Sequence, residues 1–457
     1  MSLEWIRERL ESFRHRDAIV EGGRTLRYGE LESSVRRLRQ HFALWGMKKG
    51  DVTGFTGDYS AAGVTRFLAV LLEGMTAVPI AATASSEIGR ALGAVPMDWF
   101  FPSGSSLETA PEDRRQKGQR SSHPLLDDLR ARGHAGVVIL TSGTTGQPKV
   151  ILHDATRLMQ RLCQPQHSYR ALVFLLPDHI GGIDTLVGML TSGSTLVIPE
   201  ARTPEAVGAL VEREKVELLP VTPTFLNLVL VSGAWREHDM TSLKVVSYST
   251  EVMPDHTLRE AIRAFPRVRF KQNYGSSELG VFRTRSKSSD SAFVQLEGDG
   301  VELQVRDGRL WVRGKDTMLG YLSGESSGFD TDGWYDTGDM VVEENGYLRF
   351  LGRKAEMISV GGQKVFPAEV ENALRAIEGV LECSVYGEPH ALMGHVVAAR
   401  VSLSTDESVL EFKKRMRIAL QDRLEPFKIP VKVSLGESAI SHRFKKISRR
   451  ASDEDPT

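Results

Sequence analysis

The strongest constraint on the fold is an alternation of short apolar runs with helix-like stretches through the first 290 residues. Apolar runs of five or six residues have the length of buried strands, and the stretch at 204–215 has the spacing of an amphipathic helix. Strands that alternate with helices usually pair in parallel. The runs are GVVIL at 136–140, ALVFLL at 171–176 and STLVIP at 194–199. We therefore expect a large N-terminal domain of α/β class, built on parallel sheets.

After residue 290 the pattern changes to short alternating segments separated by Gly and Asp turns. VELQV at 301–305 and RLWVR at 309–313 indicate a small antiparallel β module. A polar stretch rich in Ser, Pro and charge at 101–133 is typical of a surface loop. The module is expected to belong to the same N-terminal domain.

A second change of pattern lies near 352–356. Beyond it, helical spacing at 367–375 and 408–424 encloses strand-like runs, which predicts a small α+β unit. We expect two domains, 1–352 and 353–457, with the smaller C-terminal domain mobile about their connection.

Composition excludes several other classes of protein. The 58 basic and 59 acidic residues give a net charge of −1, so the overall charge does not favour binding to nucleic acid. No apolar run approaches the ~18 residues of a membrane-spanning helix, and the charged N-terminus lacks the apolar core of a signal peptide. The two cysteines, Cys163 and Cys383, have no metal-ligand spacing. These features predict a cytoplasmic enzyme.

The densest motif, TSGTTGQPK at 141–149, directly follows the strand expected at 136–140. Its hydroxyls and backbone amides can converge on phosphate oxygens, and Lys149 adds a positive charge. A P-loop is excluded, because Pro148 stands where the second glycine is required and Val150 where Ser or Thr is required. The residues expected around the phosphates are Thr141, Ser142, Gly143, Thr144, Thr145 and Gly146.

The phosphate loop resembles the signature of the adenylate-forming superfamily, which contains acyl- and aryl-CoA synthetases, firefly luciferase and the adenylation domains of nonribosomal peptide synthetases. Other motifs follow in that superfamily's order: TLRYGELESSVRRL at 25–38, GMKKGDVTGF at 46–55, PDHIGGIDTL at 177–186, STEVMP at 249–254, NYGSSE at 273–278, YDTGD at 335–339, GRKAEMISVGGQKVFPAEVE at 352–371 and FKKISRR at 444–450. The resemblance is nearest to the free-standing acyl- or aryl-acid ligases. It implies activation of a carboxylic acid by ATP as an acyl-adenylate.

The resemblance also assigns roles to individual residues. Asp339 would hold both ribose hydroxyls, since a carboxylate accepts two hydrogen bonds at once. Tyr274 would stack on adenine, and Glu278 would bind Mg²⁺. Arg353 would contact the ribose, and Lys446 would stabilise the charge that develops at the α-phosphate during adenylation. The other nucleotide contacts implied are Ser249, Thr250, Glu251, Asn273, Gly275, Ser276 and Ser277.

The chain departs from the superfamily pattern at several positions. Ala355 replaces a hinge Asp or Lys, and Lys445 replaces the glycine before the C-terminal lysine. The turn at 249–254 lacks the glycines that are common there. We therefore expect an atypical hinge and a purine pocket of different shape.

The substrate is expected to be an aryl or fatty acid. His179 and Gly182 would border the acyl pocket, and apolar Ile180 follows His179 where amino-acid-activating relatives place an Asp. The segment GGQKVFPAEVE favours the pantetheine thiol of CoA or of an acyl carrier protein as acceptor. Two alternatives stay open, namely an amine or other non-thiol acceptor and a catalytically silent nucleotide-binding homologue.

Overall fold

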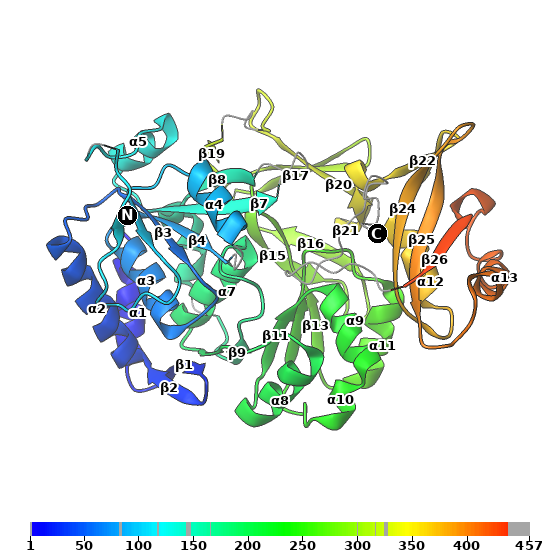
Figure 1. Ribbon diagram of the computed structural model, residues 1–457, viewed down its shortest axis with the longest axis horizontal. Coiled ribbons are helices and arrows are strands. Elements are labelled where there is room, and N and C mark those ends of the chain that lie inside the picture. The colour runs from blue at the N-terminus through cyan, green and yellow to red at the C-terminus, as the bar shows by residue number, and fades with distance from the viewer. Residues whose placement is uncertain are drawn as a thin grey trace.

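The computed structural model describes residues 2–81, 85–116, 118–142, 148–164, 166–298, 300–315, 317–323 and 328–436. In Figure 1 the N-terminal part lies at the left and centre, and the orange and red C-terminal part lies at the right. The class is α/β, as expected from the sequence. Among the described residues, no helix is both long and apolar enough to cross a membrane.

Two seven-stranded sheets form the frame of the N-terminal part. The first sheet is parallel except for the hairpin of its last two strands. Its order is β13 (Arg269–Gln272), β12 (Val245–Tyr248), β11 (Leu218–Val221), β9 (Arg170–Leu172), β10 (Thr195–Val197), β1 (Asp17–Glu21) and β2 (Arg24–Arg27).

The second sheet is parallel at its centre and antiparallel at both ends. Its order is β19 (Gly320–Tyr321), β8 (Pro148–Asp154), β7 (Gly136–Ser142), β4 (Thr76–Ile80), β3 (Val52–Thr56), β5 (Trp99–Phe101) and β6 (Glu112–Asp113). Every residue of β3 and β4 is buried, as expected of parallel strands covered on both faces.

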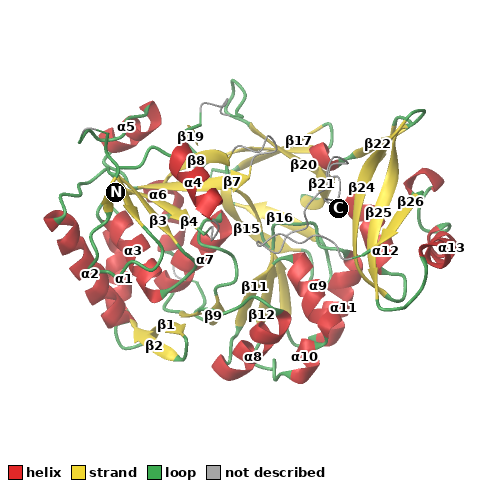
Figure 2. Ribbon diagram, viewed as in Figure 1, coloured by secondary structure: helices red, strands yellow, loops and turns green. Residues whose placement is uncertain are grey.

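Helices cover both faces of each sheet, which gives five layers (Figure 2). The middle layer is α1 (Glu4–Ser12), α2 (Tyr28–Leu44), α3 (Ala61–Leu72), α6 (Ala155–Leu158), η1 (Gln160–Cys163) and α7 (Ile180–Thr191). Outside the first sheet lie α8 (Pro204–Glu214), α9 (Pro223–Ser232), α10 (Ala234–Glu237) and α11 (Asp255–Ala264). Outside the second sheet lie α4 (Ser85–Ala94) and α5 (Pro124–Ala131).

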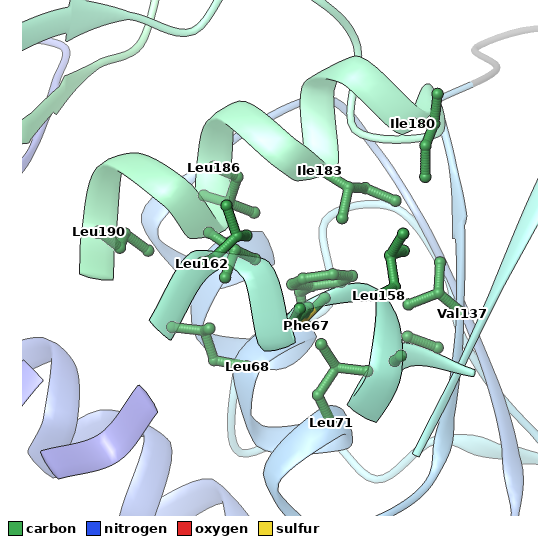
Figure 3. Packing of buried hydrophobic residues seen from close by; sticks show 14 of the residues in the cluster. Phe67, Leu68, Leu71, Val137, Leu158, Leu162, Ile180, Ile183, Leu186 and Leu190 are labelled. Atoms are coloured by element: carbon green, nitrogen blue, oxygen red, sulfur yellow. The ribbon is translucent and has the colours of Figure 1, made fainter. Parts of the chain in front are cut away.

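The main core fills the middle layer between the two sheets. Figure 3 shows Phe67 and Leu71 of α3 facing Leu158 of α6 and Ile183 of α7, close to Val137 of β7. All five side chains are at most 4% exposed. Burial of this kind stabilises a domain by about 25 cal/mol per Å² of apolar surface, and here it fixes α7 between the sheets.

The third sheet is antiparallel, as predicted for the β module. It begins earlier than expected, because the NYGSSE motif already contributes its first strand. Its order is β14 (Tyr274–Ser276), β15 (Gly280–Ser286), β16 (Phe293–Glu297), β21 (Tyr347–Arg353), β20 (Tyr335–Glu344), β18 (Arg309–Arg313) and β17 (Glu302–Arg306).

The fourth sheet has its own apolar core, which includes Val365, Leu374 and Phe412. The chain enters this part through the short helix η2 (Lys354–Glu356). Its elements are β22 (Ile358–Val360), β23 (Gln363–Val365), α12 (Pro367–Arg375), β24 (Val380–His390), β25 (Gly394–Leu403), α13 (Val409–Leu420), η3 (Pro426–Lys428) and β26 (Lys432–Leu435). A domain boundary at 352/353, and mobility of this part, stay predictions.

Two local expectations differ from the structure. The segment 101–133 contains a helix as well as loop, since Pro124 opens α5 and the His123 side chain caps it. The phosphate motif lies between two antiparallel strands, because Ser142 at the end of β7 pairs with Pro148 at the start of β8. The sheet that was expected to be parallel is therefore antiparallel between β7 and β8.

Candidate active site

A cavity of about 870 Å³ lies between the N-terminal sheets and the fourth-sheet part. One wall is formed by the segments that follow β12 and β13, the next by β20 and β21, and the opposite wall by α12 and β24. Figure 1 shows these elements around the junction of the green, yellow and orange regions. The predicted nucleotide contacts that line the cavity are Thr250, Glu251, Asn273, Tyr274, Gly275, Asp339 and Arg353.

Asp339 is the central charged group of this cavity. It lies directly opposite Arg353 in the pairing of β20 with β21, and the Arg353 Nε is 3.4 Å from Asp339 Oδ1. Asp339 Oδ2 accepts a hydrogen bond of 2.7 Å from the Tyr274 hydroxyl. Burial raises the pKa of the Asp339 carboxyl, and the Arg353 charge opposes this shift. Each carboxylate oxygen has lone pairs beyond these contacts, so Asp339 can accept further hydrogen bonds.

Aromatic rings fix the orientation of Tyr274. Its ring stacks on Phe350, with centroids 4.4 Å apart, and Phe282 lies nearly parallel at 5.9 Å. Burial and the Asp339 charge raise the pKa of Tyr274 well above its usual value, so the hydroxyl stays a donor. Adenine stacking on Tyr274 remains a prediction, and the two phenylalanine rings limit the face that a base can reach.

The turn at 249–251 and the segment at 273–274 leave the first sheet at the same edge. Tyr248 and Gln272 end neighbouring parallel strands in register, and the Asn273 N–H donates to the Tyr248 carbonyl at 2.8 Å. Glu251 Oε2 accepts from both the backbone N–H and the hydroxyl of Thr224, at 3.1 and 2.7 Å. This oxygen therefore ties the turn to the start of α9. Ligands of α/β proteins commonly bind at this edge of a parallel sheet.

A second group joins Lys149 to Glu278 through Tyr321. Tyr321 of β19 pairs with Ile151 of β8. Lys149 precedes Ile151 by two residues in β8, so the Lys149 and Tyr321 side chains lie on the same face of the sheet. The Lys149 ammonium lies 5.2 Å from the centre of the Tyr321 ring. The Tyr321 hydroxyl donates to Glu278 Oε1 at 3.3 Å. The phosphate-loop lysine and the predicted metal carboxylate thus contact the same tyrosine.

His153 and Tyr335 support this second group. His153 Nε2 donates to the Ser277 carbonyl at 2.6 Å, and burial lowers the pKa of the ring, so His153 is neutral. Burial and then the Glu278 charge raise the pKa of Tyr335. Sequence reasoning missed His153, Tyr321 and Tyr335. Of these three residues, only Tyr335 lies in one of the sequence motifs, as the first residue of YDTGD.

The donor set at Glu278 suits Mg²⁺ only together with a nucleotide. Among the described residues, no group of three or more His, Cys, Asp or Glu side chains could hold a metal ion. Mg²⁺ is commonly bound by one or two carboxylates with phosphate oxygens and water completing its shell. Glu278, which is joined to Lys149 through Tyr321, fits that pattern.

A set of polar contacts, called the seam below, joins α9 and α11 to the fourth-sheet part along the cavity. The Asn227 amide Nδ2 donates to the Leu381 carbonyl at 3.0 Å and to Glu382 Oε2 at 3.2 Å. The backbone N–H of His256 donates to Asn372 Oδ1 at 3.1 Å. Asn227 and Glu382 are 7% and 6% exposed, so the first contact is shielded from water.

A buried arginine completes the seam on its C-terminal side. Arg375 Nη2 donates to Glu382 Oε1 at 2.6 Å, and Nη1 lies 3.7 Å from Glu371 Oε2. The Arg375 side chain is 4% exposed. Two carboxylates therefore neutralise one guanidinium at the C-terminal end of α12. The hydrogen bond from Arg375 also holds Glu382 in place for its contact with Asn227.

His179 and Gly182 both shape the beginning of α7. The His179 Nδ1 accepts a hydrogen bond from the Gly181 N–H at 3.1 Å, so this ring caps the helix. A Cβ at Gly182 would lie 2.1 Å from the Leu176 carbonyl oxygen, which explains the glycine. Their role at an acyl pocket stays a prediction.

Several predicted residues cannot be placed. Gly143, Thr144, Thr145, Gly146 and Lys446 lie outside the described residues. Thr141 pairs with Lys149 across the hairpin, and the Ser142 backbone ends β7. The backbone of Ser249 follows β12, and Ser276 Oγ accepts from the Leu279 N–H at 3.2 Å. Ala355 is exposed within η2.

Known proteins resemble this chain along most of its length. The sequence pattern described as AMP-binding enzyme matches residues 6–322, and that of the AMP-binding enzyme C-terminal domain matches residues 369–440. A feruloyl-CoA synthase of an Amycolatopsis species is 28% identical, over 94% of both chains. An indoleacetate–CoA ligase of Aromatoleum aromaticum is 28% identical, over 65% of this chain and 62% of the relative. This chain thus spans less than two thirds of that second relative.

Among solved structures, o-succinylbenzoate CoA synthetase from Bacillus subtilis, in complex with an acyl-adenylate intermediate, has the same fold. Its TM-score is 0.78 at 22% identity, over 99% of this chain and 98% of the other. The family patterns confirm the resemblance drawn from the motifs, and the shared fold confirms the architecture expected from them.

Proposed function

Because the chain belongs to the AMP-binding enzyme family, we propose that it activates a carboxylic acid with ATP and passes the acyl group to a thiol. The observation that carries the proposal is the cavity in which Asp339 contacts both Tyr274 and Arg353. A largely buried carboxylate with further lone pairs suits a ribose, because it accepts both hydroxyl hydrogens. Relatives that align along most of the chain include acid–CoA ligases, which supports the same reaction here.

In the first step, a carboxylate oxygen of the acid attacks the α-phosphorus of ATP. A P–O bond to the acid forms, the P–O bond to pyrophosphate breaks, and the acyl-adenylate remains. The acid is ionised at neutral pH, so no general base is needed. Asp339 holds the ribose, while Lys149 neutralises charge on the departing pyrophosphate. Lys446 stabilises the five-coordinate phosphorus, where charge accumulates in the transition state. Mg²⁺ held by Glu278 would screen the phosphates.

In the second step, the thiol sulfur attacks the acyl carbon. The C–S bond forms, the C–O bond to AMP breaks, and the thiol proton is released to solvent. The 353–457 part rotates between the two steps, so that Lys446 withdraws and the segment SVGGQKVF at 359–366 approaches the thiol. CoA is the first candidate for the acceptor, and a carrier protein presents the same pantetheine thiol.

The acid is an aryl or fatty acid. At the start of α7, His179 is followed by Ile180, which is buried and apolar. This position therefore has no carboxylate that could bind the ammonium group of an amino acid. Relatives named for ferulate and indoleacetate support an aromatic acid. The proposed setting is the cytoplasm, where ATP and CoA are available.

A pyrophosphate-release screen across aryl, fatty and amino acids tests the proposal, with CoA or a carrier protein added in parallel. Acid-dependent release, with a thioester formed only when thiol is present, is the expected result. Asp339→Asn should reduce release, whereas Asp336→Asn is a matched control in the same motif, because Asp336 pairs with Arg309 instead. An amide product with amine and no thioester would favour the non-thiol acceptor. AMP binding without any pyrophosphate release would favour a silent homologue.

A further inference from the structure

A second cavity, of about 300 Å³, lies beside the candidate active site. Its first wall is formed by α9, α10 and α11, and its second wall by Arg375 at the end of α12 and Val380 at the start of β24. Here α11 packs against α12 (Figure 1). Asn227, Thr257 and Arg375 line both cavities, so the seam forms part of the partition between them. Among the described residues that line the second cavity, none was predicted to contact the nucleotide or the acid.

Two hydrogen-bond donors on these walls are buried without an acceptor. Trp235 Nε1 and Arg375 Nε have no hydrogen-bond partner among the residues that the structure describes. The buried Arg375 side chain directs its two terminal nitrogens to Glu382 and Glu371 in the seam. Buried N–H groups nearly always have a partner, because their removal from water without one costs free energy. A ligand with acceptor oxygens in the second cavity would give both donors a partner.

The described lining has an excess of positive charge. Besides Arg375, whose charge is balanced by the two carboxylates of the seam, it contains Arg236, Arg263 and Glu260. Arg263 Nη1 donates to Glu260 Oε1 at 2.5 Å, so these two charges offset each other. Arg236 supplies the remaining charge of the described lining, and its guanidinium lies 4.6 Å from the centre of the Trp235 ring.

The rest of the described lining is uncharged and largely apolar. Burial lowers the pKa of the His256 ring, so this ring is neutral at pH 7. The apolar side chains, together with the Trp235 ring, are Leu230, Val231, Ala264 and Val380. A volume of about 300 Å³ lies at the lower end of the range for small-molecule pockets. A ligand that fits therefore has a small apolar body and acceptor oxygens that carry negative charge.

We propose that the second cavity is an effector site for a small apolar carboxylate. The carboxylate oxygens accept hydrogen bonds from Trp235 Nε1 and Arg375 Nε, and Arg236 balances the charge. The walls belong to both sides of the seam, so the bound carboxylate holds the two parts in the arrangement seen here. A ligand that binds one arrangement more tightly shifts the molecule toward it. Since the proposed reaction requires the 353–457 part to rotate, an occupied second cavity slows that reaction, whereas binding itself does not depend on the proposed function.

The probe is phenylacetate, added to the full-length protein without nucleotide, and the readout is amide hydrogen exchange. The His256 N–H donates across the seam to Asn372 Oδ1 at 3.1 Å, so its exchange requires the seam to open. A ligand that binds only the closed seam slows this exchange by the factor 1 + [L]/Kd, which is about tenfold at ten times Kd. Phenylacetamide has the same ring without the charge, and inorganic phosphate has charge without an apolar body. Both should leave the exchange rate nearly unchanged.

Two variants test the contacts. Trp235→Phe keeps a ring and removes the Nε1 donor, so it should raise the Kd for phenylacetate about three- to tenfold, the scale of one hydrogen bond. Arg236→Gln should raise it about two- to fivefold, because Arg236 is exposed and water screens its charge. Arg259→Gln is the matched control, since Arg259 is an exposed arginine of α11 outside the described lining. Arg375 stays unchanged, because its loss would also remove the ion pairs of the seam.

An unchanged exchange rate of the His256 N–H in phenylacetate would overturn the inference. Equal slowing by phenylacetamide or by phosphate would overturn it too, because the charge or the apolar body would then not be needed. Slowing that persists undiminished in both variants would place the ligand outside the second cavity, for example in the candidate active site. Failure of the protein to bind AMP or to release pyrophosphate would overturn the proposed function and leave carboxylate binding by the second cavity untouched.

Discussion

Asn227→Ala should loosen the attachment of the fourth-sheet part to the rest of the molecule. The Asn227 amide makes the buried contacts across the seam to Leu381 and Glu382. A hydrogen bond to a neutral carbonyl contributes about 0.5–1.5 kcal/mol and one to a charged acceptor about 1.5–3 kcal/mol. Glu382 keeps its bond to Arg375, and water can enter the opened seam, which reduces the loss. We expect docking to weaken by about 2–3 kcal/mol, or about 30- to 150-fold.

Amide hydrogen exchange measures this change directly. The His256 N–H donates across the seam to Asn372 Oδ1, so its exchange rate reports how often the seam opens. Asn227→Ala should accelerate exchange at His256 and at the beginning of α12, while α3 keeps its protection. Gln421→Ala, an exposed substitution after α13, is the control. Equal exchange at His256 in the wild type and in Asn227→Ala would refute the idea that Asn227 holds the two parts together.

Asp339→Asn should weaken AMP binding, measured by calorimetry, about tenfold or more, because hydrogen bonds from the ribose hydroxyls are stronger to a charged acceptor. Unchanged affinity would show that YDTGD is only a structural turn. Lys446→Ala should slow acid-dependent pyrophosphate release roughly 10²–10³-fold but spare thioester formation from preformed acyl-adenylate, and an equal loss in both steps would contradict its role. Burial lowers the pKa of His153, so the unfolded chain binds a proton that the folded chain does not, and stability falls as pH falls below about 6.5. His153→Gln keeps a donor for the Ser277 carbonyl and should flatten this slope in denaturant titrations at several pH values; an unchanged slope would assign it to other groups.

The sequence predicted elements well where local periodicity and packing agree. The helix expected at 367–375 is α12, with the same bounds, because Pro367 opens it and apolar residues recur along one face. The helix of α5 was missed, since its apolar pair, Leu126 and Leu129, is surrounded by a long polar stretch. Local sequence therefore sufficed for the first helix and was misleading for the second.

Long-range pairing limited what could be predicted of the candidate site. The motifs contained Asp339, Tyr274 and Arg353, and in the structure Asp339 contacts both of the other residues. Tyr321 was missed because its two-residue strand pairs with β8 far away in the sequence. The left-handed backbone of Thr250, whose φ is +78°, could not be predicted either, since a threonine in the sequence carries no sign of a positive φ.

The hairpin that carries the phosphate motif affects how the site attracts its ligand. P-loops and dinucleotide folds place their phosphates at a helix N-terminus, where aligned peptide dipoles supply a permanent positive field. Here a strand follows the motif, and sheets have only small net dipoles. The described part of the motif instead offers a discrete charge, Lys149, and salt screens the interactions of solvent-exposed charges. ATP capture by this chain should therefore weaken as ionic strength rises.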